Sequence, residues 1–155
     1  MKRIASFSVN HDFIKPGIYV SRIDGDIVTY DLRTRTPNTG DLMDNASMHS
    51  MEHMFATFVR NSAMKEKIIY FGPMGCQTGF YLLVRNAEDV EVIKLIIAVL
   101  DQILAYKGEV FGATRQECGN YINLSLEKTQ TEAARYLDAV RNWTVDMLKY
   151  PEAAQ

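Results

Sequence analysis

The sequence predicts an α+β fold: a mostly antiparallel β-sheet packed on one side by helices, in a single domain over residues 1–155. Three observations lead to this prediction. Two short runs rich in β-forming residues near the start indicate a hairpin, and a second such pair follows in the middle of the chain. Long segments with apolar residues at helical spacing separate and follow these pairs. A chain of 155 residues, 47% of them hydrophobic, can bury one substantial core.

The predicted strands come in two pairs. Residues 18–23 and 27–33 are rich in isoleucine, valine and tyrosine, and a short segment with one glycine joins them into a hairpin. Residues 67–71 and 79–84 form the second pair. The segment Gly72–Cys76 between them contains two glycines and a proline, which interrupt a strand, so its cysteine should lie on an exposed bend.

The first predicted helix covers residues 45–60. Asp44 or Asn45 caps it, the segment lacks proline and glycine, and its apolar residues recur three and four positions apart. A polar loop over residues 34–44 leads into it. Ser125 is a second expected N-cap, because a helical pattern follows it. The remaining helices are predicted over residues 88–107, 125–140 and 144–150.

Composition and charge exclude several classes of function. The formal net charge of −2 gives no basic surface for nucleic acid or an anionic membrane. No apolar run approaches the roughly 20 residues that span a bilayer. The basic start at Lys2 and Arg3 has no apolar segment after it, so no secretory signal is expected and the protein is predicted to be cytoplasmic. In such a chain Cys76 and Cys118 favour metal binding or catalysis over a disulfide.

The helix over residues 45–60 carries a His-x-x-Glu-His motif. His49 and His53 stand at positions i and i+4 of one helix face, and Glu52 projects from nearly the same side. Two imidazoles at this spacing suit a divalent metal, and a carboxylate beside them suits proton transfer. The motif therefore predicts a metal site, although an amphipathic helix also carries such residues by chance.

A catalytic metal site usually takes three protein ligands and leaves one position open, so the rest of the chain must supply a third ligand. From residue types alone the candidates are His11, Cys118, and a glutamate such as Glu127 or Glu132. A thiolate combined with imidazoles suits zinc or ferrous iron. If Cys118 binds the metal, Cys76 remains free as an acid/base group or a nucleophile.

Several separate motifs, in order along most of the chain, resemble those of the S-ribosylhomocysteine lyase (LuxS) family, which makes the precursor of autoinducer-2. The matching residues are Ser6-Phe7, Asn10-His11, Asp31-Leu32-Arg33, Pro37-Asn38, His49 to His53 running on to Arg60, Pro73 to Tyr81, and Cys118-Gly119.

The resemblance implies a role for each matching residue. His49, His53 and Cys118 would bind one divalent metal per subunit, ferrous iron natively or zinc, and Glu52 and Cys76 would be the two general acid/base groups. The resemblance also implies an α+β homodimer with active sites at the subunit interface, some of the substrate contacts coming from the partner chain. The residues expected to hold the substrate, S-ribosylhomocysteine, are Ser6, His11, Arg33 and Arg60.

The chain departs from the family pattern at three positions. Tyr70 stands where relatives usually have aspartate, and Gly72 stands where they have serine. The aspartate position contributes to substrate binding in the family, so this departure concerns recognition of the sugar rather than the metal or the acid/base pair. Arg35 occupies a position where relatives often carry cysteine.

Three other interpretations compete with the lyase. A small metallopeptidase-like hydrolase would use Glu52 to activate water, but it gives Cys76 no task. A non-catalytic metal-binding module needs a fourth protein ligand, which His11 or Cys76 would have to provide. A domain without any metal is the third. The resemblance favours the lyase, because a single motif would support all of these equally.

Overall fold

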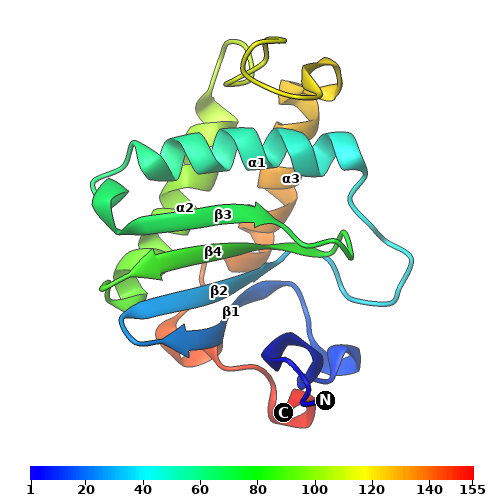
Figure 1. Cartoon of the computed structure of the whole chain (residues 1–155), viewed down its shortest axis with the longest axis vertical. Helices are drawn as coiled ribbons and strands as arrows, with labels where there is room; N and C mark the ends of the chain where they lie inside the picture. Colours follow the sequence, from blue (N-terminus) through cyan, green and yellow to red (C-terminus); the bar gives the residue numbers. More distant parts are fainter.

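The computed structural model describes all residues from Met1 to Gln155. Its sheet has four antiparallel strands in the order β1-β2-β4-β3. Figure 1 shows α2 and α3 behind one face of this sheet and α1 running along its β3 edge. The predicted α+β class, with an antiparallel sheet covered by helices on one side, is thereby confirmed. The strands are β1 Gly17–Asp24, β2 Ile27–Arg33, β3 Ile68–Pro73 and β4 Gly79–Arg85, and the α-helices are α1 Asn45–Arg60, α2 Asp89–Ala105 and α3 Leu126–Val140.

Short 3₁₀-helices occupy much of the remaining chain. The predicted C-terminal helix over residues 144–150 is only such a turn, over Val145–Leu148. The 3₁₀-helices are η1 Ala5–Phe7, η2 His11–Phe13, η3 Lys65–Lys67, η4 Tyr121–Asn123, η5 Val145–Leu148 and η6 Glu152–Ala154.

The third strand extends further than its sequence indicates. Gly72 and Pro73 were expected to break it, yet they pair with Tyr81 and Phe80 of β4. Proline is tolerated there because β3 is an edge strand and needs no hydrogen-bond donor on its free side. The connection between β3 and β4 is therefore a turn over residues 74–78. Cys76 lies at the centre of this turn, whereas the sequence indicated a bend that began at Gly72.

A stack of aromatic rings fixes α1 on the sheet. The ring of Phe55 from α1 stacks on Phe71 of β3 with centroids 4.4 Å apart, and Phe71 stacks on Phe80 of β4 at 5.0 Å. All three rings are buried in one continuous core. Met51 and Met54 of α1 enter the same core, so the rotation of α1 about its axis is set by packing.

The start of α1 is fixed by Asp44. Its side chain accepts a hydrogen bond from the backbone N–H of Ser47 at 2.7 Å and so caps the helix. Lys128 of α3 binds the other carboxylate oxygen at 2.7 Å. Of the two predicted caps, Asp44 is the one used, and Ser125 caps α3 as predicted, by accepting from the N–H of Lys128.

Replacing Asp44 by alanine should lower the free energy of unfolding by about 1 kcal/mol at neutral pH. The hydrogen bonds from Lys128 and Ser47 lower the pKa of Asp44 to about 2. Because the folded pKa lies below the unfolded value, this stabilisation is present above a pH of about 4 and is lost as the pH falls towards about 2.

Urea denaturation of metal-free protein at several pH values measures this difference. Lys128→Met keeps the hydrogen bond to Ser47 and should lose less stability than Asp44→Ala. A difference between wild type and Asp44→Ala that persisted undiminished at the lowest pH would contradict the assignment of the cap.

Candidate metal centre and active site

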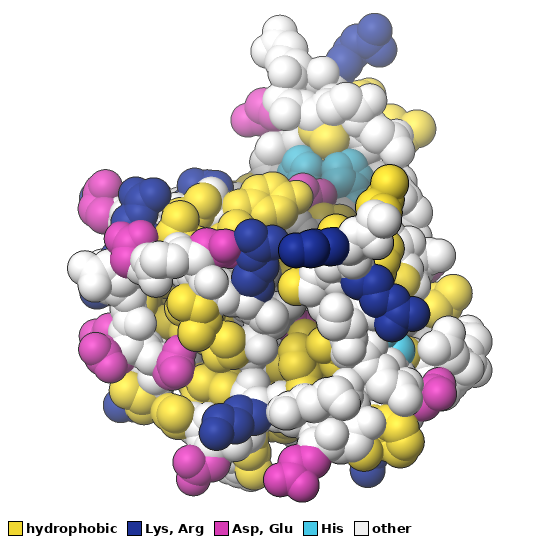
Figure 2. All heavy atoms as spheres, turned by 60° about the horizontal axis from the view of Figure 1, so that its bottom comes forward, with side chains coloured by type: hydrophobic (Ala, Val, Ile, Leu, Met, Phe, Trp, Pro, Cys, Tyr) yellow, Lys and Arg dark blue, Asp and Glu magenta, His cyan; other side chains and the backbone are white.

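The side of α1 opposite the core carries the His-x-x-Glu-His motif. Because successive helix residues are about 100° apart, burial of Met54 and Phe55 turns His49, Glu52 and His53 towards the surface. The two imidazole rings meet edge to face with centroids 4.6 Å apart. Figure 2 shows a pair of histidine side chains next to each other at the surface, with an acidic side chain beside them.

Cys118 comes to this pair from a loop between α2 and α3. Its Sγ lies 3.3 Å from Nε2 of His49, and one ligand atom from each of Cys118, His49 and His53 lies within 4.8 Å of the others. Two ligands at the tetrahedral angle on a zinc ion are about 3.5 Å apart, given the usual Zn–S and Zn–N distances. These three residues therefore form a donor set that fits one divalent metal.

Hydrogen bonds through Nδ1 orient both imidazoles. Nδ1 of His53 donates to the backbone carbonyl of Phe111 at 2.7 Å, and Nδ1 of His49 donates to the amide oxygen of Asn123 at 2.6 Å. Because these oxygens only accept, Nε2 of each ring keeps its lone pair for a metal. The amide group of Asn123 is fixed in turn by Asn45 at the start of α1, 2.7 Å away.

Gly112 allows the loop to approach His53 this closely. Its φ of +70° is unfavourable for any residue with a side chain, and a Cβ there would lie 3.1 Å from Nδ1 of His53. Sequence reasoning missed Gly112, Asn45, Asn123 and the carbonyl of Phe111 as parts of the centre. The only signal was the glycine itself, in a loop without a hairpin or helix end to explain it.

The other candidates for a third ligand lie elsewhere. Glu132 is buried and binds Arg35 at 2.5 Å. Glu127 is exposed in the first turn of α3, and His11 belongs to η2 near the N-terminus. Of the candidates for a third ligand, only Cys118 lies beside His49 and His53.

Glu52 borders a hollow of about 220 Å³ together with His49, Pro73 and Asn120. Its carboxylate is half-buried and makes no hydrogen bond to the protein. A carboxylate that faces an open hollow without a protein partner is free to exchange protons with a bound molecule.

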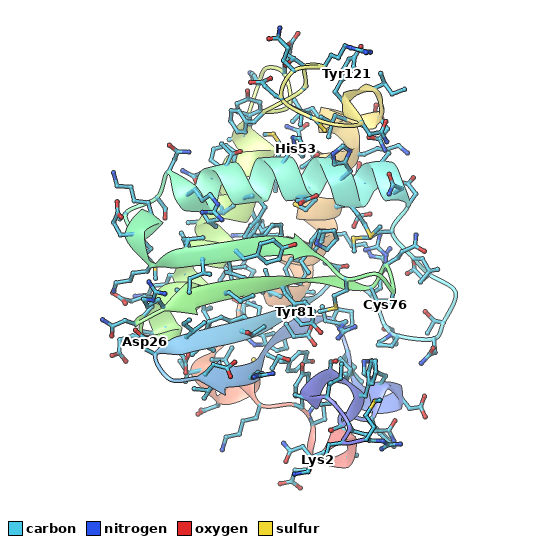
Figure 3. The ribbon with its side chains drawn as sticks, viewed as in Figure 1. Lys2, Asp26, His53, Cys76, Tyr81 and Tyr121 are labelled. Carbon is cyan, nitrogen blue, oxygen red and sulfur yellow. The ribbon has the colours of Figure 1, made fainter.

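Cys76 and His53 lie in different parts of the molecule (Figure 3). Cys76 is on the exposed turn between β3 and β4, and His53 faces the loop that carries Tyr121. A second hollow, of about 470 Å³, is lined by Cys76, His11 and Thr78. The hydroxyl of Thr78 is 3.0 Å from Sγ of Cys76. The structure therefore joins Cys76 with His11 in one hollow and Glu52 with His49 in another.

Arg33 supports the turn from below. It is 2% exposed, and its guanidinium binds both carboxylate oxygens of Asp31 and donates to Thr78 at 2.8 Å. Nη1 of Arg33 lies 4.0 Å from Sγ of Cys76. Burial disfavours the charged guanidinium, but the attraction of Asp31 outweighs it and the pKa of Arg33 is raised. Tyr150 donates to Asp31 at 2.6 Å and completes this buried group.

The other predicted substrate residues are less closely grouped. Ser6 lies in η1, half-buried, and borders neither hollow. Arg60 ends α1, on the same side as the motif but about 10 Å along the helix from His53. Its Nη2 donates to the carbonyl of Ile69. Their roles remain predictions.

Two of the departures from the family pattern are physically coupled. The ring of Tyr70 lies over Gly72, so that a Cβ at position 72 would be 2.5 Å from Cζ of Tyr70 and closer still to its hydroxyl. Both residues point to the same face of β3, because they are two positions apart. Glycine at 72 therefore leaves room for the ring of Tyr70 in this position, and a serine there would displace the ring.

Comparison with known proteins places these residues in context. The model of the S-Ribosylhomocysteinase (LuxS) family matches residues 4–147. A protein of Clostridium acetobutylicum named S-ribosylhomocysteine lyase is 42% identical, with 98% of this chain and 100% of the relative covered. Proteins with the same name from Borrelia garinii and Finegoldia magna are each 41% identical, covering 97% and 98% of this chain and 100% of each relative.

Replacing Asn123 by alanine should weaken metal binding by about 10- to 100-fold, because His49 loses the partner that orients its ring. Competition with a chromophoric chelator measures this affinity. Asn120→Ala is a control that leaves the His49 hydrogen bond intact.

Cys118→Ala should lose the metal in elemental analysis, and full metal retention in that variant would contradict the proposed donor set.

Gly72→Ser should destabilise the protein by up to about 1 kcal/mol, because the half-exposed ring of Tyr70 must turn away to make room for the side chain. The double variant Tyr70→Ala, Gly72→Ser should recover most of this loss, since the ring is then absent. A double-mutant cycle from urea denaturation measures the coupling. Equal destabilisation by Gly72→Ser with and without Tyr70 would rule out the contact as the cause.

Proposed function

The chain belongs to the S-ribosylhomocysteinase (LuxS) family, and we propose that it is an S-ribosylhomocysteine lyase that uses Glu52 and Cys76 as proton-transfer groups. It cleaves the thioether of S-ribosylhomocysteine to homocysteine and 4,5-dihydroxy-2,3-pentanedione, the autoinducer-2 precursor. The observation that carries the proposal is the cluster of His49, His53 and Cys118 with Glu52 beside it on α1.

The reaction is balanced without water. The carbonyl of the open-chain sugar moves from C1 to C2 and then to C3, and each move takes one proton from carbon and returns one to the neighbouring carbon. With the carbonyl at C3, removal of the C4 proton expels the C5 sulfur as homocysteine thiolate, which takes up a proton. The remaining enol tautomerises to the dione.

His49, His53 and Cys118 would hold the divalent metal that the family implies. When bound, such a metal supplies Lewis acidity that stabilises negative charge on a substrate oxygen. Imidazole and thiolate donors suit ferrous iron and zinc alike. We assign ferrous iron as the native metal and zinc as its substitute, which metal analysis of protein purified without oxygen would test.

Glu52 and Cys76 reach the substrate from different elements, α1 and the β3–β4 turn. In the proposal Cys76 acts as thiolate in the early proton transfers and Glu52 in the later ones, including the C4 proton. The guanidinium of Arg33 lies 4.0 Å from the sulfur of Cys76. The free carboxylate of Glu52 can both accept and return a proton beside the metal ligands.

The proposed substrate contacts are His11, Arg33, Ser6 and Arg60. His11 lines the Cys76 hollow, and its Nδ1 donates to the carbonyl of Val9, which leaves Nε2 to accept a hydrogen bond from a sugar hydroxyl. Arg33 acts through Cys76 and Thr78 in this chain. Ser6 and Arg60 would meet the substrate across a subunit interface, as the family resemblance implies.

We also propose that the protein is a homodimer. One face of the sheet has no helix over it and carries Tyr70, Tyr81 and Leu83, of which Tyr70 is 49% exposed. A partly apolar sheet face of this kind supports pairing with a second copy. Light scattering would measure the molar mass of the protein in solution and so its oligomeric state.

No helix here is both long and apolar enough to span a bilayer. We propose a cytoplasmic location, which two free cysteines support.

The alternatives are less well supported. A closed structural metal site needs four ligands, and the cluster offers three. A hydrolase leaves the hollow around Cys76 without a task.

Glu52→Gln and Cys76→Ala should each keep the metal and lower the rate of homocysteine release by about 10²–10⁴-fold. Both substitutions remove a proton acceptor without touching a metal ligand. The assay incubates metal-loaded protein with S-ribosylhomocysteine and measures homocysteine after the protein is removed. Glu127→Gln, an exposed glutamate of α3, is the matched control. Normal turnover by either active-site variant would remove that residue from the mechanism.

A further inference from the structure

The loop between β2 and α1 forms one wall of the Cys76 hollow. Pro37, Asn38, Gly40 and Leu42 line that hollow opposite Cys76. The loop contains no helix or strand, and its path includes positive φ angles at Asn38 and Gly40. A wall made of irregular backbone needs contacts elsewhere to hold its shape.

Both ends of the loop are bound to the turn that carries the cysteine. The N–H groups of Thr34 and Arg35 donate to the carbonyl of Thr78 at 2.9 and 3.1 Å. At the other end, the N–H of Met43 donates to the carbonyl of Gln77 at 3.1 Å, and the side chain of Gln77 donates back to Met43 at 2.7 Å. The two residues after Cys76 thus clamp both ends of the wall.

Charged side chains tie the middle of the loop to α3. Arg35 is 4% exposed, and its Nη2 donates to Glu132 of α3 at 2.5 Å. Its Nε lies 3.2 Å from the carboxylate of Asp41, further along the same loop. Asp41 also forms an ion pair with Arg135 of α3. Arg35 therefore joins both limbs of the loop to one helix.

Stability alone does not account for this arrangement. Glu132 is 6% exposed, and its second carboxylate oxygen has no hydrogen-bond partner. Nε of Arg35 is within ion-pair distance of Asp41, but it too lacks a hydrogen bond of good geometry. Burying such incompletely paired charges is unfavourable, and apolar side chains of similar volume commonly stabilise a protein as well or better. What the planar guanidinium adds is a fixed direction for each contact.

We propose that Arg35 is a positioning residue for the lyase reaction: by tying Asp41 of the loop over residues 36–42 to Glu132 of α3, it shapes the hollow in which Cys76 meets the substrate. This inference rests on the proposed function only for its effect on turnover. The effect on the order of the loop follows from the contacts alone.

The test uses the metal-loaded double variant Arg35→Met, Glu132→Leu, which replaces the buried pair with apolar side chains. We expect a midpoint of thermal unfolding close to that of the wild type. We expect kcat/KM for S-ribosylhomocysteine to fall about 10- to 100-fold, mainly through KM. Amide hydrogen exchange over residues 36–42 should become about fivefold faster, the change in open population that ~1 kcal/mol produces. Arg35→Lys, which retains one contact to Glu132, should show a smaller change in each of these measurements.

Arg141→Met is the matched control, because Arg141 also lies at α3 and pairs with an aspartate, Asp101, away from the loop. It should leave KM and the hydrogen exchange of residues 36–42 unchanged. Wild-type KM and wild-type hydrogen exchange over residues 36–42 in the folded double variant would overturn the proposal. If the unmodified protein released no homocysteine, the proposed function would fail, while hydrogen exchange over residues 36–42 would still test the anchor.

Discussion

The packing of α1 into the core is the constraint on which the rest of the site depends. The stack of Phe55 on Phe71 and Phe80 fixes the orientation of α1 about its axis. In this orientation His49, Glu52 and His53 all face outwards. A rotation of α1 by about 100°, the angle between successive residues, would carry His53 to the buried position that Met54 now holds. The capping of α1 by Asp44 and the bond of Asp44 to Lys128 add a fixed starting point.

Around this helix the site is built in two halves with different supports. The half with His49, His53 and Cys118 relies on neutral hydrogen bonds that the histidine rings donate to Phe111 and Asn123, which fix the tautomer of each ring. The Cys76 half relies on charge: Arg33, Asp31 and Tyr150 beneath the turn, and Arg35 with Glu132 behind its wall. This division fits the proposed roles, since a metal-binding imidazole needs a free lone pair and a cysteine that transfers protons works best beside a positive charge.

Much of the architecture was predictable because its signals are local. The hairpin of β1 and β2, the span of α1 and the cap at Ser125 follow from residue propensities and spacing over a few positions. Extension of β3 through Pro73 was not predicted, since tolerance of a proline depends on β3 being at the edge of the sheet. The two family departures at Tyr70 and Gly72 become one feature only when the ring is seen over the glycine.

The sequence by itself determined the α+β class, the helical face that carries the His-x-x-Glu-His motif and the exposed bend with Cys76, because helical and strand periodicities are properties of neighbouring residues. Only the tertiary structure decided which distant residue joins the histidines. Cys118 lies beside His49, whereas Glu132 lies against Arg35, and no spacing along the chain distinguishes these two outcomes. The deciding factor is how the loops after β2 and α2 pack against α1 and α3, a matter of contacts between residues about 70 and 97 positions apart.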